Sequence, residues 1–129
     1  MWIAANPRLH EGKVLNTGHC MRHVQLVADV PHSSKLRRGQ RVVDMPDPPR
    51  GLVIATFDEA GRYANKTDGS SHIAILLAQQ PDGLMVMDQW VGHPVSMRLI
   101  RRNNGQGSAV NDADRFYVAE SDDDRAATV

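Results

Sequence analysis

The sequence reads HIAILLAQQPDGLMVMDQW over residues 72–90, and this stretch decides the fold class. Two apolar runs, His72–Ala78 and Leu84–Trp90, flank the turn-forming segment Gln79–Gly83. Two such runs joined by a short turn are typical of an antiparallel β-hairpin. A turn centred near residue 80 or 81 would set His72 opposite residues 88–90 on the second strand.

Three further short runs have the composition of strands, and they cover residues 52–57, 95–100 and 115–119. The segment DMPDPPRG at residues 44–51 has three prolines in eight positions, so we expect a loop there. Residues 58–71 and 101–114 are rich in Gly, Asn, Asp and Ser. We expect them to form two long loops that frame a groove.

The first third of the chain favours helix. Apolar residues recur at helical spacing between residues 20 and 28, and they predict a helix with one buried face. That face carries Cys20, Val24, Val27 and Ala28. Upstream, Thr17 is a candidate N-cap and Gly18 permits a sharp entry, while Pro31 ends the segment.

A second short helix is predicted over Ser34–Arg38, ended by Gly39. A helical first third followed by about five strands with short turns predicts an α+β fold with an antiparallel sheet. The helix that begins at Cys20 would pack on this sheet through its apolar face.

Length and composition limit what the chain can be. The 129 residues have a mass of 14.3 kDa, which suits one domain over residues 1–120, followed by a disordered acidic tail over 121–129. Fifteen Lys and Arg balance fifteen Asp and Glu, so we expect no nucleic-acid partner. No apolar run of about 18 residues is present, so we expect no membrane insertion.

The single cysteine is a candidate nucleophile. Cys20 lies at the predicted start of a helix, where unpaired N–H groups and the helix dipole favour a thiolate. His72 opens a strand, and Asp88 on the next strand comes close to it if the hairpin forms as predicted. A carboxylate that binds one imidazole nitrogen leaves the other free to face a thiol. The sequence therefore permits a Cys–His–Asp set.

Two other interpretations of these residues remain. A lone cysteine is often a small buried apolar residue, and Asp88 could simply be solvated at the strand end. His19, Cys20 and His23, together with His72, could also supply metal ligands, but their spacing is not a standard zinc pattern. We therefore expect no metal and no cofactor.

The motifs resemble the papain-like amidases of the NlpC and CHAP (cysteine, histidine-dependent amidohydrolase/peptidase) kind. More closely, the chain resembles a family of small proteobacterial proteins similar to type VI amidase effectors, over about residues 10–120. The shared motifs are EGK (11–13), TGHC (17–20), VQLV (24–27), IATF (54–57), GRYAN (61–65), HIAILL (72–77), MDQW (87–90) and NDADRF (111–116).

This resemblance implies a papain-like fold and a cysteine amidase or peptidase that cuts peptide amides of bacterial peptidoglycan. It implies Cys20 as the nucleophile, His72 as the general base and Asp88 as the residue that orients His72. The position before the cysteine is often Gln in such families, but it is His19 here, so His19 and the Cys20 N–H are candidates to bind the oxyanion.

Three further residues are candidates for the oxyanion hole or the substrate site, and they are Tyr63, Gln89 and Trp90. Strand alternation turns Gln89 away from the face of Asp88, which makes it the weaker oxyanion candidate. Trp90 at a strand end could line a groove or serve packing, and Tyr63 could contact substrate or anchor its loop.

The N-terminal stretch MWIAANPRLHEGK lacks the pattern of a signal peptide. We expect synthesis in the cytoplasm and, from the resemblance, specialised secretion into the periplasm or cell wall of a target cell, as an antibacterial effector or a lysin. The resemblance also implies a possible immunity protein as partner. Two alternatives stay open: a non-catalytic binding or neutralising protein on the same fold, and a thioester-forming acyltransferase.

Overall fold

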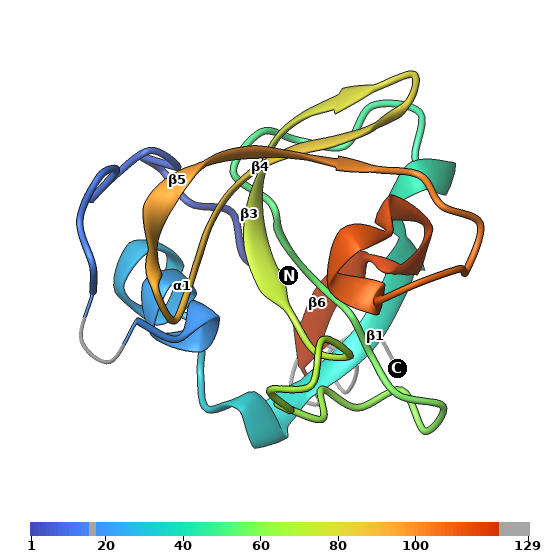
Figure 1. Cartoon of the computed structure of the whole chain (residues 1–129), viewed down its shortest axis with the longest axis horizontal. Coiled ribbons are helices and arrows are strands. Elements are labelled where there is room, and N and C mark those ends of the chain that lie inside the picture. The colour runs from blue at the N-terminus through green and yellow to red at the C-terminus, as the bar shows by residue number, and fades with distance from the viewer. Residues whose placement is uncertain (16–17, 122–129) are drawn as a thin grey trace.

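The computed structural model describes residues 1–15 and 18–121 of the chain. In this part of the chain, one α-helix is followed by six β-strands with short 3-10 turns between them (Figure 1). The helix and strands are α1 (Cys20–Ala28), β1 (Leu36–Arg41), β2 (Val53–Ala55), β3 (Ile73–Gln80), β4 (Gly83–Trp90), β5 (His93–Arg101) and β6 (Tyr117–Ser121). The 3-10 turns are η1 (Ser33–Lys35), η2 (Val42–Asp44), η3 (Ala109–Asn111) and η4 (Ala113–Arg115).

All strands belong to one sheet of order β1-β6-β2-β3-β4-β5, and every neighbouring pair is antiparallel. The predicted hairpin is β3–β4, in which Ile75 lies opposite Met87. Continued to the end of the strands, this register sets His72 beside Trp90 and one diagonal step from Asp88.

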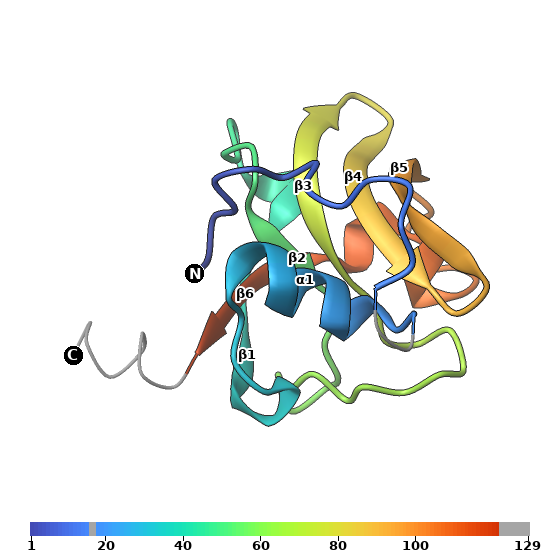
Figure 2. The ribbon, with the colours of Figure 1, turned by 90° about the vertical axis from the view of Figure 1, so that its left-hand side faces the viewer.

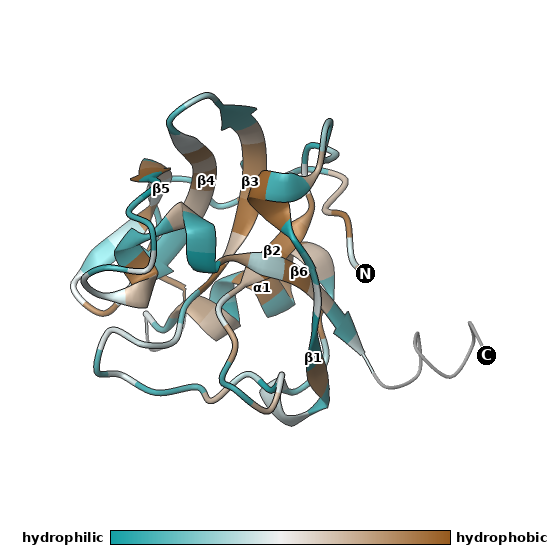
Figure 3. Cartoon of the chain, turned by 90° about the vertical axis from the view of Figure 1, so that its right-hand side faces the viewer, coloured by the Kyte–Doolittle hydropathy of each residue, from teal (hydrophilic) through white to brown (hydrophobic). Residues whose placement is uncertain are grey.

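The sheet carries apolar side chains on both faces, which is why its central strands are almost continuously apolar. Ile73, Ile75 and Leu77 pack with Val24 of α1 on one face, and α1 crosses this face in Figure 2. Ala74 and Leu76 pack on the opposite face with residues of β4, β6 and η4. Figure 3 shows these central strands as the apolar part of the molecule, surrounded by hydrophilic loops.

The helix over residues 20–28 is confirmed, and its predicted apolar face packs against the core of the sheet. Its N-cap is His19, preceded by Gly18 with a φ of +87°, a conformation that glycine adopts without strain. The candidate N-cap Thr17 lies outside the described residues. α1 has nine residues, and no helix within residues 1–15 and 18–121 is long and apolar enough to cross a membrane.

The short helix predicted over residues 34–38 is wrong, and the sheet has six strands instead of about five. Only residues 33–35 form a helical turn, and Leu36–Arg41 is the strand β1, paired with β6. Gly39 does not end a helix: a Cβ at this position would lie 2.8 Å from the Val118 carbonyl oxygen, so glycine permits the close approach of β6. The local pattern could not reveal a partner strand about 80 residues away.

The end of the chain differs from expectation by one residue. Ser121, expected to begin the tail, is the last residue of β6 and pairs with Leu36 of β1. The rest of the predicted tail, residues 122–129, lies outside the described residues.

Candidate active site

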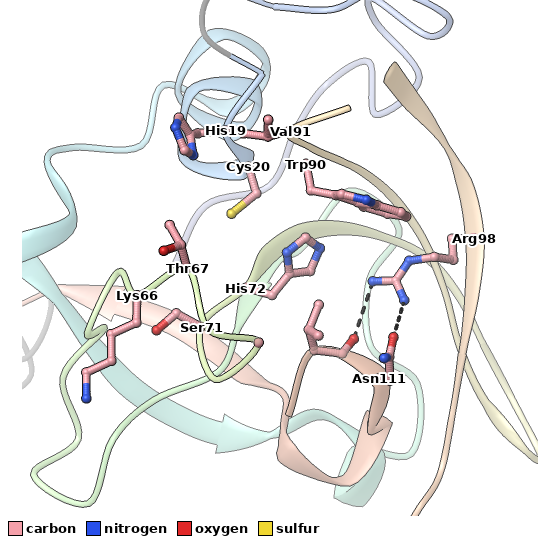
Figure 4. A pocket seen from close by; sticks show the side chains of 12 residues that line it. His19, Cys20, Lys66, Thr67, Ser71, His72, Trp90, Val91, Arg98 and Asn111 are labelled. Atoms are coloured by element: carbon pink, nitrogen blue, oxygen red, sulfur yellow. Dashed lines mark hydrogen bonds between the residues drawn. The ribbon is translucent and has the colours of Figure 1, made fainter. Parts of the chain in front are cut away.

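A pocket of about 330 Å³ opens where the N-terminus of α1 meets the adjoining ends of β3 and β4 (Figure 4). Both long loops predicted to frame a groove contribute to its wall, through residues of 66–71 and 110–111. Its polar and aromatic lining includes His19, Cys20, Lys66, His72, Trp90 and Arg98.

Cys20 is the first residue of α1, and its side chain and the ring of His72 line the same pocket in Figure 4. The position of this helix end is fixed by Gln89 of β4, whose amide is fully buried beneath it. The Gln89 Nε2 donates to the carbonyl of His19 at 2.9 Å and to that of Leu15 at 3.1 Å. Its Oε1 accepts the Leu15 N–H at 3.1 Å. Gln89 therefore ties two segments that are distant in sequence, β4 and the stretch that leads into α1, together beside Cys20.

His72 precedes β3 and is fixed through its backbone by Thr56. The Thr56 N–H donates to the His72 carbonyl at 2.9 Å, and the His72 N–H donates to the Thr56 Oγ1, also at 2.9 Å. The ring packs edge-on against Phe116 and Trp90, with centroid separations of 6.3 and 6.4 Å. With these contacts His72 is only 2% exposed, but it still lines the pocket.

The Asp88 carboxylate lies behind the imidazole. His72 Nε2 is 2.7 Å from Asp88 Oδ2, so the second ring nitrogen is left for the side of the pocket that holds Cys20. Asp88 is fully buried, and its Oδ2 also accepts two hydrogen bonds from Arg98. Burial raises the pKa of Asp88, but hydrogen bonds from His72 and Arg98 outweigh it, so the pKa lies below its usual value.

The thiol and the imidazole shift each other's pKa. Burial raises the pKa of Cys20, but hydrogen bonding to His72 and the charge of its ring have the larger combined effect, and the pKa falls below its ordinary value. Burial lowers the pKa of His72, but hydrogen bonds to Asp88 and Cys20 raise it to about 9. Together these shifts favour a thiolate–imidazolium pair at neutral pH.

Tyr63 lies beside the sulfur of Cys20. Its hydroxyl lies 3.5 Å from the Cys20 sulfur, and its side chain is buried, with only 6% exposed. Burial, with the neighbouring sulfur, raises the pKa of the Tyr63 phenol, so it stays protonated and can donate to a thiolate. Tyr63 therefore contacts the candidate nucleophile, and it is not among the residues that line the pocket.

Trp90 and His19 both line the pocket. Trp90 is 38% exposed and its indole stacks on the ring of His93, with 4.0 Å between centroids. His19 is exposed at the N-terminus of α1, and its ring makes no capping hydrogen bond there, so it is free to face a ligand. Gln89, the weaker oxyanion candidate, does not line the pocket, and its amide nitrogen donates to the backbone carbonyls of Leu15 and His19.

His23, one helical turn after Cys20, is fully buried, and neither ring nitrogen has a hydrogen-bond partner among the described residues. Burial lowers its pKa to about 4, so the ring is neutral at pH 7. Within residues 1–15 and 18–121, no group of three or more His, Cys, Asp or Glu side chains is arranged to hold a metal ion.

Sequence reasoning missed Arg98 and Thr56. A signal for Arg98 was present, because it is the one charged residue in the apolar run VSMRLI at 95–100. A charge in the middle of a strand needs a partner, and Asp88 is the acidic residue on the neighbouring strand. Thr56 gave no such signal, since threonine is common at the end of any strand.

The chain is similar to proteins of one amidase effector family. A model of the domesticated amidase effector 2 family matches residues 2–119. The type VI secretion amidase effector 2 protein of Salmonella typhi is 35% identical over 120 residues, covering 84% of this chain and 89% of that protein. The domesticated amidase effector 2 of Ixodes scapularis is 40% identical over 72 residues, covering 56% of this chain and 46% of that protein.

Among solved structures, a type 6 secretion amidase effector 2 superposes with a TM-score of 0.81 at 30% identity, covering 93% of this chain and 94% of the other. This likeness confirms the predicted α+β, papain-like fold, and the resemblance to type VI amidase effectors is confirmed as well. The chain belongs to the domesticated amidase effector 2 family.

Proposed function

We propose that this protein hydrolyses peptide amide bonds of bacterial peptidoglycan, with Cys20 as nucleophile, His72 as acid and base, and Asp88 as the residue that orients His72. The observation that carries the proposal is that a thiol and an imidazole line one open pocket, with a buried carboxylate bound to the imidazole from behind. The membership of the chain in an amidase effector family supports the same class of reaction and substrate.

The chemistry follows from the positions of these groups. The Cys20 thiolate attacks the amide carbonyl carbon, and the carbonyl electrons move onto oxygen. When the tetrahedral intermediate collapses, the C–N bond breaks and the His72 imidazolium gives its proton to the leaving amine. Neutral His72 then takes a proton from water, whose oxygen attacks the thioester carbon; the C–S bond breaks, and a carboxylic acid leaves with the Cys20 thiolate and the His72 imidazolium restored. Asp88 keeps the imidazole ring oriented through both steps.

The oxyanion would lie at the start of α1. The first backbone N–H groups of a helix have no partner within the helix, and the dipole there favours negative charge. The N–H of Cys20 is one such donor, and the exposed ring of His19 beside it is a second candidate. The buried Gln89 amide supports this helix end from below, which keeps these donors in place.

We further propose that the protein acts after delivery into a target cell, on its cell wall. The named activity of the Salmonella typhi relative, a type VI secretion amidase effector, supports this. A cell that makes such an enzyme would need an immunity protein against it, and the pocket around Cys20 is the site that such a partner would have to block.

Digestion of purified peptidoglycan tests the function. Wild-type protein, Cys20→Ala and His72→Ala are incubated with sacculi in water labelled with oxygen-18, and the fragments are identified by mass spectrometry. We expect fragments with a free amine and one labelled oxygen in the new carboxyl group, from the wild type only. Fragments joined to a new amine without label would indicate an acyltransferase. No fragments from a folded wild type would indicate a binding protein.

A further inference from the structure

Arg98, on β5, lines the pocket and donates hydrogen bonds to the buried Asp88 carboxylate. It pairs in register with Val86 of β4, and its guanidinium reaches diagonally to Asp88, two residues further along the same strand. Arg98 Nη2 donates to Asp88 Oδ2 at 2.7 Å, and Nε donates to the same oxygen at 3.0 Å. This is also the oxygen that lies 2.7 Å from His72 Nε2.

The contacts of Asp88 are concentrated on one atom. Oδ1 is buried and has no hydrogen-bond partner among the described residues, so Oδ2 carries all the described hydrogen bonds of the carboxylate. A fully buried carboxylate needs a compensating cation. The His72 imidazolium cannot fill this role alone, because its charge is shared with the Cys20 thiolate. Arg98 supplies the second positive charge, which brings the set of four groups to neutrality.

The guanidinium is itself held in place. Its Nη1 donates to the Asn111 Oδ1 at 3.2 Å and its Nη2 to the Val110 carbonyl at 3.4 Å, as the dashed lines in Figure 4 show. The same group lies 5.1 Å from the centroid of the Trp90 ring, within the range of a cation–π interaction. Only 19% of the Arg98 side chain is exposed, so most of it serves contacts inside the protein.

We propose that Arg98 is a positioning residue for this reaction: it fixes and charge-balances the Asp88 carboxylate, and through Asp88 it keeps the Cys20–His72 pair in its reactive form. The inference rests on the proposed function of Cys20, His72 and Asp88. A lysine can replace the charge of Arg98 but not its two-pronged contact with Oδ2, so charge and geometry can be separated by substitution.

Other titratable groups surround the four residues, and all of them are kept in the variants below. His19 is the N-cap of α1 and His23 lies within the helix, the segment between β2 and β3 contributes Tyr63 and Lys66, and β5 contributes His93. Because these groups are common to every variant, differences between the variants report on Arg98 alone.

The first measurement is the rate at which iodoacetamide alkylates Cys20, followed between about pH 5 and pH 9 in wild type, Arg98→Gln and Arg98→Lys. Loss of a buried cation disfavours the thiolate, so we expect the midpoint of the curve of alkylation rate against pH to rise by about one pH unit in Arg98→Gln. At a pH below both midpoints, alkylation should then be roughly tenfold slower than in the wild type. Arg98→Lys should shift less. Arg102→Gln is the matched control, because Arg102 donates to Asp114 at 2.8 Å outside the pocket, and it should keep the wild-type profile.

A second comparison stays informative even if Arg98→Gln fails to fold. In the Asp88→Asn background the carboxylate charge is gone, so adding Arg98→Gln should slow alkylation by no more than about twofold. The inference would be overturned if Arg98→Gln slowed alkylation a further tenfold in the Asp88→Asn background. It would also be overturned if folded Arg98→Gln kept the wild-type dependence of alkylation rate on pH. The assay needs no peptidoglycan, so a wild-type Cys20 that reacts like a free thiol would instead count against the proposed nucleophile.

Discussion

Replacement of His23 by leucine tests how the helix that carries Cys20 responds to acid. His23 is fully buried in α1, has no described hydrogen-bond partner, and has a pKa lowered by burial to about 4. In the unfolded chain the same imidazole takes up a proton near pH 6.5. The unfolded state therefore gains a proton before the folded state does, and the protein loses stability as the pH falls from about 6.5 to about 4.

The size of this effect follows from the pKa difference. A difference of about 2.5 pKa units corresponds to roughly 3 kcal/mol, fully lost by about pH 4. Leucine has a similar volume and does not titrate. We therefore expect His23→Leu to be at least as stable as the wild type at pH 7, since it removes a buried polar group without a described partner, and to avoid this acid-dependent loss.

Urea unfolding, followed by circular dichroism at pH 7 and at about pH 4, measures the difference directly. The exposed His19 provides the control, because His19→Leu removes an imidazole without removing a buried one. The expected result is a pH-dependent loss that is smaller by about 2–3 kcal/mol in His23→Leu than in the wild type. If both proteins lost the same free energy of unfolding between pH 7 and about pH 4, His23 would not be a neutral imidazole buried in the folded state.

Three further predictions concern the site itself. Tyr63→Phe removes the hydroxyl 3.5 Å from the Cys20 sulfur, so alkylation of Cys20 near pH 6 should slow by about two- to tenfold in a rate assay. Thermal melting should show little change in stability. Gln89→Leu leaves the backbone groups of Leu15 and His19 without their buried partner, and should cost about 2–3 kcal/mol in urea unfolding as well as slowing alkylation. Asp88→Asn should lower the pKa of His72 from about 9, which NMR titration of the ring would detect. A raised histidine pKa stabilises the fold fully below about pH 6.5, and this stabilisation is lost as the pH rises through about 9. The variant should therefore lose less stability than the wild type over that pH range. An unchanged His72 titration in Asp88→Asn would contradict the described hydrogen bond.

The parts of the fold that were predictable are those set by local pattern. The hairpin from His72 to Trp90 follows from two apolar runs and a turn, and its register brings His72 to Asp88 without any long-range information. The helix at Cys20 follows from apolar spacing over nine residues. These elements contain the three proposed catalytic residues, so the core of the site was accessible from sequence.

The parts that were not predictable depend on pairing between distant segments. The local pattern predicts a helix over Ser34–Arg38 because this stretch has no strand signal of its own, but residues from Leu36 onward form a strand by pairing with β6 near the far end of the chain. Gln89 shows the same limit in the site: strand alternation indicated its face but not that α1 would lie on it. Arg98 needed the β4–β5 register before its partner was evident.

The central claim is that Cys20 attacks the amide carbon and carries the acyl group. Acid quenching of a digestion in progress, followed by mass spectrometry of the protein, measures this most directly. The account predicts a peptidoglycan fragment attached to the peptide that contains Cys20, released by hydroxylamine as expected of a thioester, and absent from Cys20→Ala. Cleavage at the wild-type rate by Cys20→Ala, with no adduct on the wild type, would contradict it.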